Sequence, residues 1–282
     1  MIVRSPTSPS TSWDTKVNFE SDRISECIDE YVSSSAGWAH FSEGAGFRSG
    51  DSIEFLADAR SIDGVSLLDV SAARIRVIEQ MTWLKRLSIP NGCEGLNLSN
   101  HACLEELYVC DSRGLAYPPY AAPLKRLHIS KLASRHIDLS SLAWPALESV
   151  SLVQCRFLSL DGVEVLGRLR KLEMYYCQKL QRLSALRTAC VEELTIECCQ
   201  KIVDYDILGD CSSIKKLRIL GVKNLLSIDF LSRMKSIEEV RLGRTPIADG
   251  NVEPLMRAAT FYCMDARHHN HTMRDLQKIR DK

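Results

Sequence analysis

Apolar and polar residues follow a fixed pattern along most of this chain. Eight segments share the order apolar-x-x-apolar-x-apolar, and their first residues lie twenty to twenty-three positions apart. These first residues are Leu84, Leu104, Leu124, Leu147, Leu169, Val191, Ile214 and Ile237. Closely spaced apolar positions separated by polar ones predict a short strand with one buried side. Such a strand recurring at this interval predicts stacked turns, because a single turn cannot bury its apolar side alone.

The unit that begins at Leu169 carries the pattern furthest. It continues through Cys177, Leu180, Leu183 and Leu186, which gives L-x-x-L-x-L-x-x-C-x-x-L-x-x-L-x-x-L. Over roughly residues 62–263 the chain resembles the leucine-rich-repeat family, whose units span about 20–29 residues, and it is most similar to the short-repeat bacterial type. The resemblance implies an α/β solenoid: a right-handed superhelix with a concave parallel β-sheet, mostly 3₁₀ or irregular return segments, and short N- and C-terminal caps.

We expect nine to ten short strands whose middle residues are exposed and whose flanking apolar residues are buried. A divergent first repeat begins at Ile62, and a last strand includes Phe261 to Cys263. Eight strands are expected at Leu87–Ile89, Leu107–Val109, Leu127–Ile129, Val150–Leu152, Leu172–Met174, Leu194–Ile196, Leu217–Ile219 and Val240–Leu242.

The remaining sequence predicts four regions. A Ser-, Thr- and Pro-rich tail at residues 1–12 is expected to be disordered. Residues 13–60 form an N-terminal cap region with a helix at Ser21–Ser33, where apolar residues recur at helical spacing. Residues 61–264 form the solenoid of about nine repeats, and residues 265–282 form a C-terminal cap. In that cap Thr272 is expected to be the N-cap of a helix, with Asp275 at its third position.

Two further positions in each unit carry charges whose sign alternates from one unit to the next. Lys85-Arg86 is followed by Glu105-Glu106, Lys125-Arg126, Glu148-Ser149, Arg170-Lys171, Glu192-Glu193, Lys215-Lys216 and Glu238-Glu239. Equivalent residues on neighbouring parallel strands lie about 4.8 Å apart, so alternating signs attract across each junction. We interpret this charge ladder as structural, because a slip by one unit would place like charges together.

Three cysteines recur at the end of successive strands. Cys155, Cys177 and Cys199 are spaced by twenty-two residues, at the position where many proteins of the resembled family carry asparagine. This substitution is similar to the cysteine-containing repeats of F-box substrate receptors. A column with one thiol per turn cannot converge on a metal ion, which needs about four ligands at one point, so we expect buried thiols.

Composition limits the possible partners. Lysine plus arginine and aspartate plus glutamate each total 36, and no basic stripe survives the interleaved glutamates. We therefore expect no nucleic-acid binding. No apolar run is long enough to span a membrane, which takes about twenty residues. The eleven cysteines form no paired framework, which indicates reduced thiols and a cytoplasmic location.

Catalytic and metal-binding motifs are absent from the sequence. No Gly-rich phosphate loop, nucleophile elbow or zinc-protease helix occurs, so we expect neither an enzyme nor a cofactor. The tract His268-His269-Asn270-His271 resembles a metal-binding segment, but it follows the last strand, and we interpret it as part of the cap.

The concave face provides the candidate binding residues, because tyrosine and arginine are enriched at the centres of protein interfaces. The solvent-facing residue of each strand and the residues at its end give Tyr108, His128, Glu173, Tyr175, Tyr176, Glu197, Arg218, Arg241 and Arg244. They predict a non-enzymatic module that binds another protein.

The specific role stays open between three hypotheses. A short-repeat chain that ends in a His-rich segment resembles the immunity proteins of bacterial toxin systems, which implies a cognate toxin as the partner. An adaptor or F-box-like substrate receptor is the first alternative. A secreted effector that acts inside a host, with the N-terminal tail as its signal, is the second.

Overall fold

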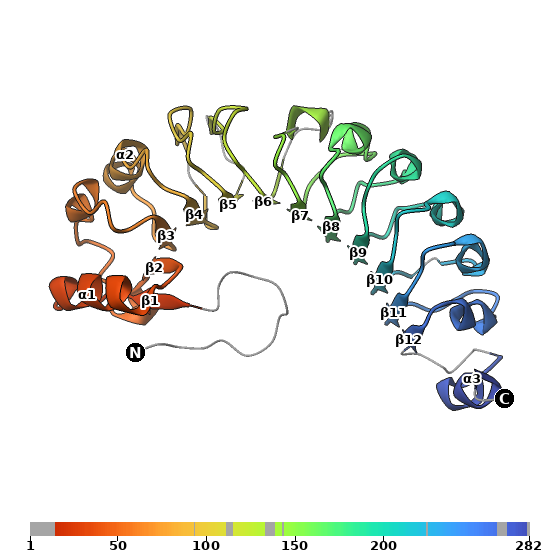
Figure 1. Ribbon diagram of the computed structural model, residues 1–282. Helices are drawn as coiled ribbons and strands as arrows, with labels where there is room; N and C mark the ends of the chain where they lie inside the picture. Colours follow the sequence, from red (N-terminus) through yellow and green to blue (C-terminus); the bar gives the residue numbers. More distant parts are fainter. Residues whose placement is uncertain are drawn as a thin grey trace. The chain divides into compact units, whose positions relative to one another are not determined.

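The computed structural model describes residues 15–92, 94–110, 115–132, 139–142, 144–223, 225–263 and 270–280. The tail expected at residues 1–12 and the side chains of His268 and His269 lie outside these ranges. The chain forms two compact units, Met1–His128 and Ile129–Lys282. Each unit consists of short strands joined by longer return segments (Figure 1).

The first unit stacks its strands in chain order, and two of its return segments are α-helices. Consecutive strands pair in parallel, with Ser66 opposite Ser88 and Ser88 opposite Tyr108. The elements are β1 (Lys16–Asn18), α1 (Ile24–Ser34), β2 (Trp38–Phe41), η2 (Glu43–Ala45), η3 (Glu54–Ala57), β3 (Gly64–Leu67), α2 (Ala72–Gln80), β4 (Arg86–Ile89) and β5 (Glu106–Cys110).

The second unit alternates a five-residue strand with a short 3₁₀ helix, labelled η. Its consecutive strands also pair in parallel, and β6 (Arg126–Ser130) lies at the boundary of the units. The elements are η4 (Leu139–Leu142), β7 (Ser149–Val153), η5 (Val163–Val165), β8 (Lys171–Tyr175), η6 (Ser184–Arg187), β9 (Glu193–Glu197), η7 (Tyr205–Asp210), β10 (Lys216–Leu220), η8 (Asp229–Arg233), β11 (Glu239–Gly243), η9 (Glu253–Arg257), β12 (Thr260–Cys263) and α3 (Met273–Arg280).

All eight strands expected between Leu87 and Leu242 are present, each one or two residues longer than the pattern alone predicts. The strand order follows the chain order, so the predicted parallel sheet is confirmed. Consensus apolar side chains form the core, and in the turn of β8 they are fully excluded from solvent. These are Leu169, Leu172, Met174, Cys177, Leu180 and Leu183, each 0% exposed.

The sheet begins earlier than the repeat pattern indicates. β1 and β2 pair in parallel within the segment expected to be a cap, with Val17 opposite Ala39. The described residues therefore contain twelve strands, where nine to ten were expected. β1 buries Val17, and β2 buries Trp38, Ala39 and Phe41. The apolar positions of the β2 unit are Ala36, Ala39 and Phe41, with two weakly hydrophobic alanines, and they precede Ile62 and Val65 by twenty-six residues, outside the interval of the later repeats.

The return segment after β3 also differs from the 3₁₀ or irregular backbone that was expected. It forms the nine-residue helix α2. The Ser71 side chain caps the helix by accepting a hydrogen bond from the Arg74 N–H at 3.3 Å, as an N-cap serine does. Val77 and Ile78 are buried on one side of the helix, which fixes it against the core.

Both helices expected near the ends of the chain are present. α1 starts three residues later than predicted and buries Cys27 and Tyr31, which lie one turn apart. At the other end, the Asp275 N–H donates to Thr272 Oγ1 at 3.2 Å, and the Thr272 N–H donates to Asp275 Oδ2 at 2.9 Å. This reciprocal pair is a capping box, which confirms Thr272 as the N-cap of α3.

The residue after each strand from β6 to β11 adopts a left-handed backbone. Its φ angle lies between 51° and 63° at Lys131, Gln154, Tyr176, Cys198, Gly221 and Arg244. After β6 to β10 the N–H of this residue reaches across to the next turn: the Tyr176 N–H donates to the Glu197 carbonyl at 2.8 Å, and the Cys198 N–H donates to the Leu220 carbonyl at 2.8 Å. The chain turns at this point, and the side chain of the following residue is buried.

The expected cysteine column occupies that following position. Each thiol donates a hydrogen bond to a carbonyl of the preceding turn: Cys155 to Ile129 at 3.6 Å, Cys177 to Leu152 at 3.5 Å, and Cys199 to Met174 at 3.7 Å. The Thr245 hydroxyl makes the same contact with the Ile219 carbonyl at 3.2 Å. These side chains thus supply a donor that links successive turns, which is a structural role.

Several junctions of the charge ladder are ion pairs in the structure. Lys125 lies 2.8 Å from Glu105, and Lys216 lies 2.6 Å from Glu193. Glu192 lies between two cations, at 3.4 Å from Arg170 and 2.8 Å from Lys215, and the hydrogen bond from Lys215 lowers the Glu192 pKa. The alternating signs therefore attract across consecutive strands, as predicted.

The ladder extends one turn further toward the N-terminus than the sequence pattern indicated. Asp63 precedes β3 and forms ion pairs with Lys85, at 3.2 Å, and with Arg86. Burial by itself raises the Asp63 pKa, but the two cations lower it below its ordinary value.

Reversing one rung tests the charge ladder. Glu192→Lys replaces two attractions with two repulsions, so it should lower the melting temperature at low salt. Added salt should shrink the difference from wild type, because it screens exposed charges. Glu253→Lys is the matched control: it makes the same change in net charge in η9, at a carboxylate with no ion pair in the described residues. Equal melting temperatures for the two variants at low salt would show that the ladder contributes nothing.

Thiol labelling tests the column. Cys155, Cys177 and Cys199 are buried, whereas Cys103 and Cys190 are exposed. The neighbouring Cys177 thiol together with burial raises the pKa of Cys155 and of Cys199, and a protonated thiol is a poor nucleophile. We expect an aromatic disulfide reagent to label Cys103 and Cys190 at once and the column only after denaturation. Fast labelling of Cys177 in the native protein would contradict the buried column.

Candidate functional site

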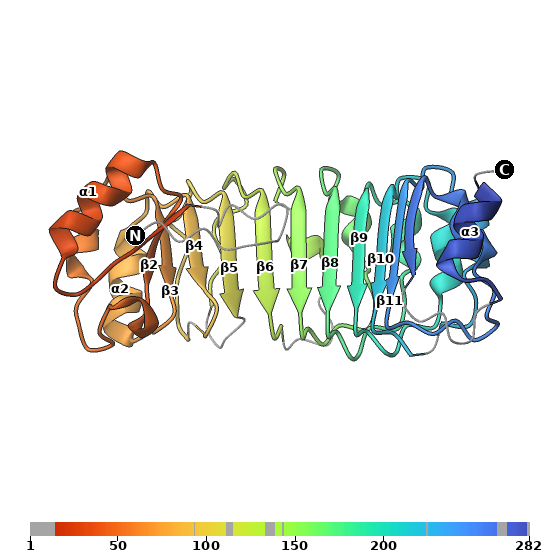
Figure 2. The same ribbon diagram turned by 90° about the horizontal axis from the view of Figure 1, so that it is seen from below.

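The candidate residues of the second unit lie on one side of its sheet, which we term the open face: the side formed by strand residues that alternate with the buried ones. Figure 2 shows the strands side by side. The register places three rows across this face. The first row is Ser149, Lys171, Glu193, Lys216, Glu239 and Thr260. The middle row is Ser151, Glu173, Thr195, Arg218, Arg241 and Tyr262. The third row is Val153, Tyr175, Glu197, Leu220 and Gly243.

Tyr175 stands in the third row between acidic neighbours. It is half-buried and lies opposite Glu197 on the adjacent strand. Burial, with the nearby Glu173 carboxylate, raises the Tyr175 pKa, and Arg218 opposes that shift. The hydroxyl therefore stays protonated and able to donate a hydrogen bond across the ordinary pH range.

Arg218 and Arg241 share one carboxylate. Glu239 Oε1 lies 3.4 Å from Arg218 Nη2 and 2.6 Å from Arg241 Nε. The side chain of Glu239 is only 20% exposed, while that of Arg241 is 55% exposed. The Glu239 carboxylate thus pairs with both guanidinium groups, and both arginine side chains remain partly exposed to solvent.

Arg244 reaches across two turns. Its Nη2 lies 3.5 Å from Glu197 Oε1, although the residues are separated by forty-seven positions. Leu220 and Gly243 lie between them in the register, and Gly221 follows Leu220. A Cβ on Gly221 would come within 2.8 Å of Cys198 Sγ, and its φ is +63°. Gly221 and Gly243 thus add no side chain of their own to this part of the face.

Tyr176 occupies the left-handed position after β8, with φ of 55°. Few non-glycine residues adopt this conformation, and here the backbone hydrogen bond to Glu197 holds it. The turn places the phenol outward, where it is 46% exposed. Tyr175 and Tyr176 therefore present adjacent aromatic groups at different heights.

The arginines of this patch are not free cations. Arg218, Arg241 and Arg244 are all paired with carboxylates, so the second unit offers a mixed-charge surface with tyrosines. The sequence reasoning counted the arginines but omitted Glu239, because it belongs to the first row. Tyr262, 51% exposed, and the half-buried Leu220 were also omitted, although both stand in phase with the chosen residues.

The remaining two candidates, Tyr108 and His128, lie in the first unit and form an aromatic cluster. Their rings stack with centroids 5.9 Å apart. The Trp38 ring meets Tyr108 edge-on at 5.8 Å, even though β3 and β4 lie between their strands. Such contacts stabilise a packed cluster. Tyr108 and His128 are therefore packed against aromatic neighbours within their own unit.

Two middle residues are buried, contrary to the expectation that all would be exposed. Ser88 is 1% exposed and Thr195 is 6% exposed. Ser88 lies beside Tyr108, and Thr195 lies between Glu173 and Arg218. The larger neighbouring side chains cover these small ones, so burial on this face depends on the adjacent strands.

A histidine with two serine partners lies on the same side of the first unit. His40 Nδ1 is 3.1 Å from Ser66 Oγ, and its Nε2 is 3.2 Å from Ser42 Oγ. A serine next to a histidine can form a nucleophile and its base. All three side chains are more than nine-tenths buried, so a substrate cannot reach them. We interpret the trio as a satisfied polar contact of the fold.

Within the described ranges, no group of three or more His, Cys, Asp or Glu side chains could hold a metal ion. No helix in the described part of the chain is long and apolar enough to cross a membrane.

Comparison with known proteins identifies the fold. No family model and no curated protein matches the sequence. Among solved structures, an internalin (inlF) of Listeria monocytogenes superposes with a TM-score of 0.50 at 14% identity, covering 77% of this chain and 73% of the internalin. The chain has the leucine-rich-repeat fold. A leucine-rich-repeat protein of Leptospira interrogans gives a TM-score of 0.40 at 12% identity, covering 95% and 92%.

The pH dependence of the free energy of unfolding tests whether His40 is held buried and neutral in this leucine-rich-repeat chain. Burial, with a smaller effect of Lys16, lowers the His40 pKa from 6.5 to about 4. The unfolded chain therefore binds more protons between these values, and stability should fall as pH falls from 6.5 to 4, by roughly 2–3 kcal/mol. His40→Gln removes the titration and should flatten this part of the curve in denaturant unfolding. If stability in the variant fell with pH as steeply as in the wild type, His40 would not be the group whose protonation destabilises the fold.

Proposed function

We propose that this leucine-rich-repeat chain is a non-enzymatic module that binds another protein through the open face of its second unit. The observation that carries the proposal is the sharing of Glu239 by Arg218 and Arg241 beside Tyr175 and Tyr176. Arginine and tyrosine supply most of the energy at protein interfaces. An arginine already held by a carboxylate loses less side-chain freedom on binding.

The character of the partner follows from the charges. Every arginine on this face has a carboxylate partner, so a purely acidic partner would have to compete with Glu197 and Glu239. A partner with both charge signs around an apolar or aromatic centre can pair with the arginines and with the carboxylates of this face. The tyrosine hydroxyls offer hydrogen bonds at the edges of that contact.

The experiment begins with the native partner, captured from lysate and identified by mass spectrometry, and then measures affinity. Tyr176→Asn removes the phenol while keeping a residue that tolerates the left-handed backbone. Arg218→Ala removes one fork while Glu239 keeps Arg241. Each should weaken the complex by about 2 kcal/mol, with little change in melting temperature.

Gln154→Asn is the matched control for Tyr176→Asn. Gln154 is exposed and occupies the same left-handed position as Tyr176, at the end of the neighbouring strand β7. The change should therefore leave affinity unaltered. Wild-type affinity in both Tyr176→Asn and Arg218→Ala would show that the partner binds elsewhere.

A finer proposal is that the partner is a bacterial toxin and the chain its cytoplasmic immunity protein. Its support is the sequence resemblance stated above. Adaptor and effector roles are the alternatives. A toxin gene beside this one, and loss of toxicity when both proteins are produced together, would support immunity. Capture of a multi-subunit assembly would favour the adaptor.

A further inference from the structure

A second surface lies in the return segments of the second unit, away from the open face. There a groove of about 610 Å³ is lined by residues that follow β9 and β10. Its walls carry two large apolar side chains in solvent: Val203 is 80% exposed and Leu226 is 76% exposed. Ile202, Leu225 and Phe230 form its buried floor.

The fold itself does not require apolar residues at these two positions. Backbone hydrogen bonds join the equivalent sites of successive turns: the Gln181 N–H donates to the Leu158 carbonyl at 2.9 Å, and the Val203 N–H donates to the Gln181 carbonyl at 3.1 Å. Further along, the Asp249 N–H donates to the Leu226 carbonyl at 3.1 Å. Gln181 and Asp249 show that polar side chains suit the site. Leucine stands at the equivalent residue 158 with 44% exposure, whereas Val203 and Leu226 are the most exposed apolar side chains of this series.

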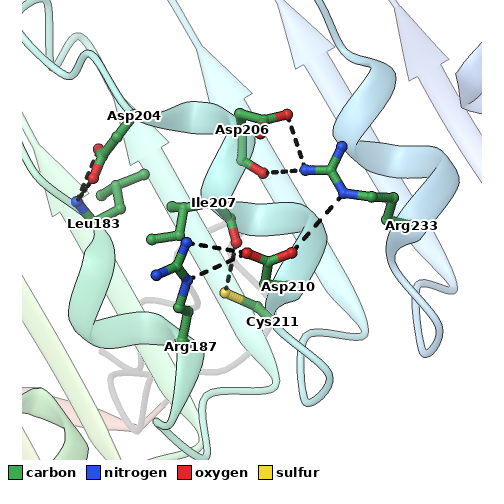
Figure 3. A network of polar contacts seen from close by, with 8 residues as sticks. All are labelled: Leu183, Arg187, Asp204, Asp206, Ile207, Asp210, Cys211 and Arg233. Carbon is green, nitrogen blue, oxygen red and sulfur yellow. Dashed lines mark hydrogen bonds and ion pairs between the residues drawn. The ribbon is translucent and has the colours of Figure 1, made fainter.

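The walls of the groove are held by a polar network (Figure 3). Arg233 of η8 donates to the Asp206 carboxylate at 2.9 Å and to the Asp206 carbonyl at 2.7 Å, which ties η8 to η7. Its guanidinium packs against Gly209, where a Cβ would come within 2.6 Å. Asp210 continues the network to Arg187 of η6 at 3.2 Å. The groove is thus fixed before any partner arrives, which lowers the entropy lost on binding.

The rim of the groove is acidic. Asp206 and Asp229 both line it, against the single cation Lys201. Arg233 holds Asp206, and its charge also acts on Asp229, which is exposed and has no ion pair within the described residues. Asp229 stands next to Phe230 and close to Leu226. An unpaired carboxylate beside an apolar groove is complementary to a cation that follows an apolar side chain.

We propose that the groove between Val203 and Leu226 binds a segment of a partner protein that inserts one large aliphatic or aromatic side chain, with a lysine or arginine beside it facing Asp229. This contact is separate from the open face and does not depend on it. An exposed apolar site rimmed by polar groups marks such an interaction surface, and an apolar anchor in a pocket supplies its energy.

A displayed library of random twelve-residue peptides, panned on the purified full chain, tests the proposal. The enriched peptides should carry a large apolar residue next to lysine or arginine. A synthetic fluorescent copy should bind the double variant Val203→Gln, Leu226→Gln about tenfold more weakly, because the apolar contact is lost. Asp229→Asn should weaken binding less and remove most of its salt dependence.

The controls separate this surface from the others. Glutamine already occupies the equivalent position at residue 181, so the double variant should keep the wild-type melting temperature. Tyr176→Asn, on the open face, should bind the peptide as wild type does. No enrichment, enriched peptides without a basic residue, or unchanged binding by the double variant would each overturn the proposal. Dimers of the wild type that the double variant abolishes would also overturn it, because a second copy would then cover the groove.

Discussion

The hydrogen bond from the residue after each of the strands β6 to β10 to the next turn is the contact on which the structure of the second unit depends. It forces the residue after the strand into a left-handed backbone, seen at Tyr176 and Cys198. That geometry turns the following side chain into the core, where Cys177, Cys199 or Thr245 donates to the turn behind. Each turn is thereby joined to one neighbour by main-chain atoms and to the other by a side chain. This explains why small donors recur at that position.

The same constraint shapes the surface available to a partner. A left-handed residue projects its side chain outward at the strand end, so its identity is free to vary: tyrosine at 176, glycine at 221 and arginine at 244. Glycine at 221 presents no side chain, and Arg244 reaches Glu197 from two strands away. Side chains from different turns therefore combine into one mixed-charge surface. The fold fixes the backbone position of each residue, and contacts with neighbouring side chains determine the conformation of its side chain.

This difference accounts for what the sequence could and could not predict. The strands, the buried apolar positions, the cysteine column and the charge ladder follow from a repeat interval, which is a local property of the chain. β1 and β2 were not predicted because β2 carries alanine at two of its three repeat positions and lies twenty-six residues before β3, outside the regular interval. The burial of Ser88 and Thr195 and the pairing of Arg218 with Glu239 depend on side chains twenty or more residues away. Such contacts need the register between strands and the reach of each rotamer.

The two proposed surfaces differ in how they would select a partner. On the open face each arginine already has a carboxylate, so binding exchanges one set of ion pairs for another and gains little unless the geometry matches. That exchange favours specificity. The groove at Val203 and Leu226 exposes apolar area that water hydrates poorly, so covering it gains free energy with few directional demands. A partner that covered both would draw much of its affinity from the groove and its identity from the open face, and loss of either contact would then change a different property of the complex.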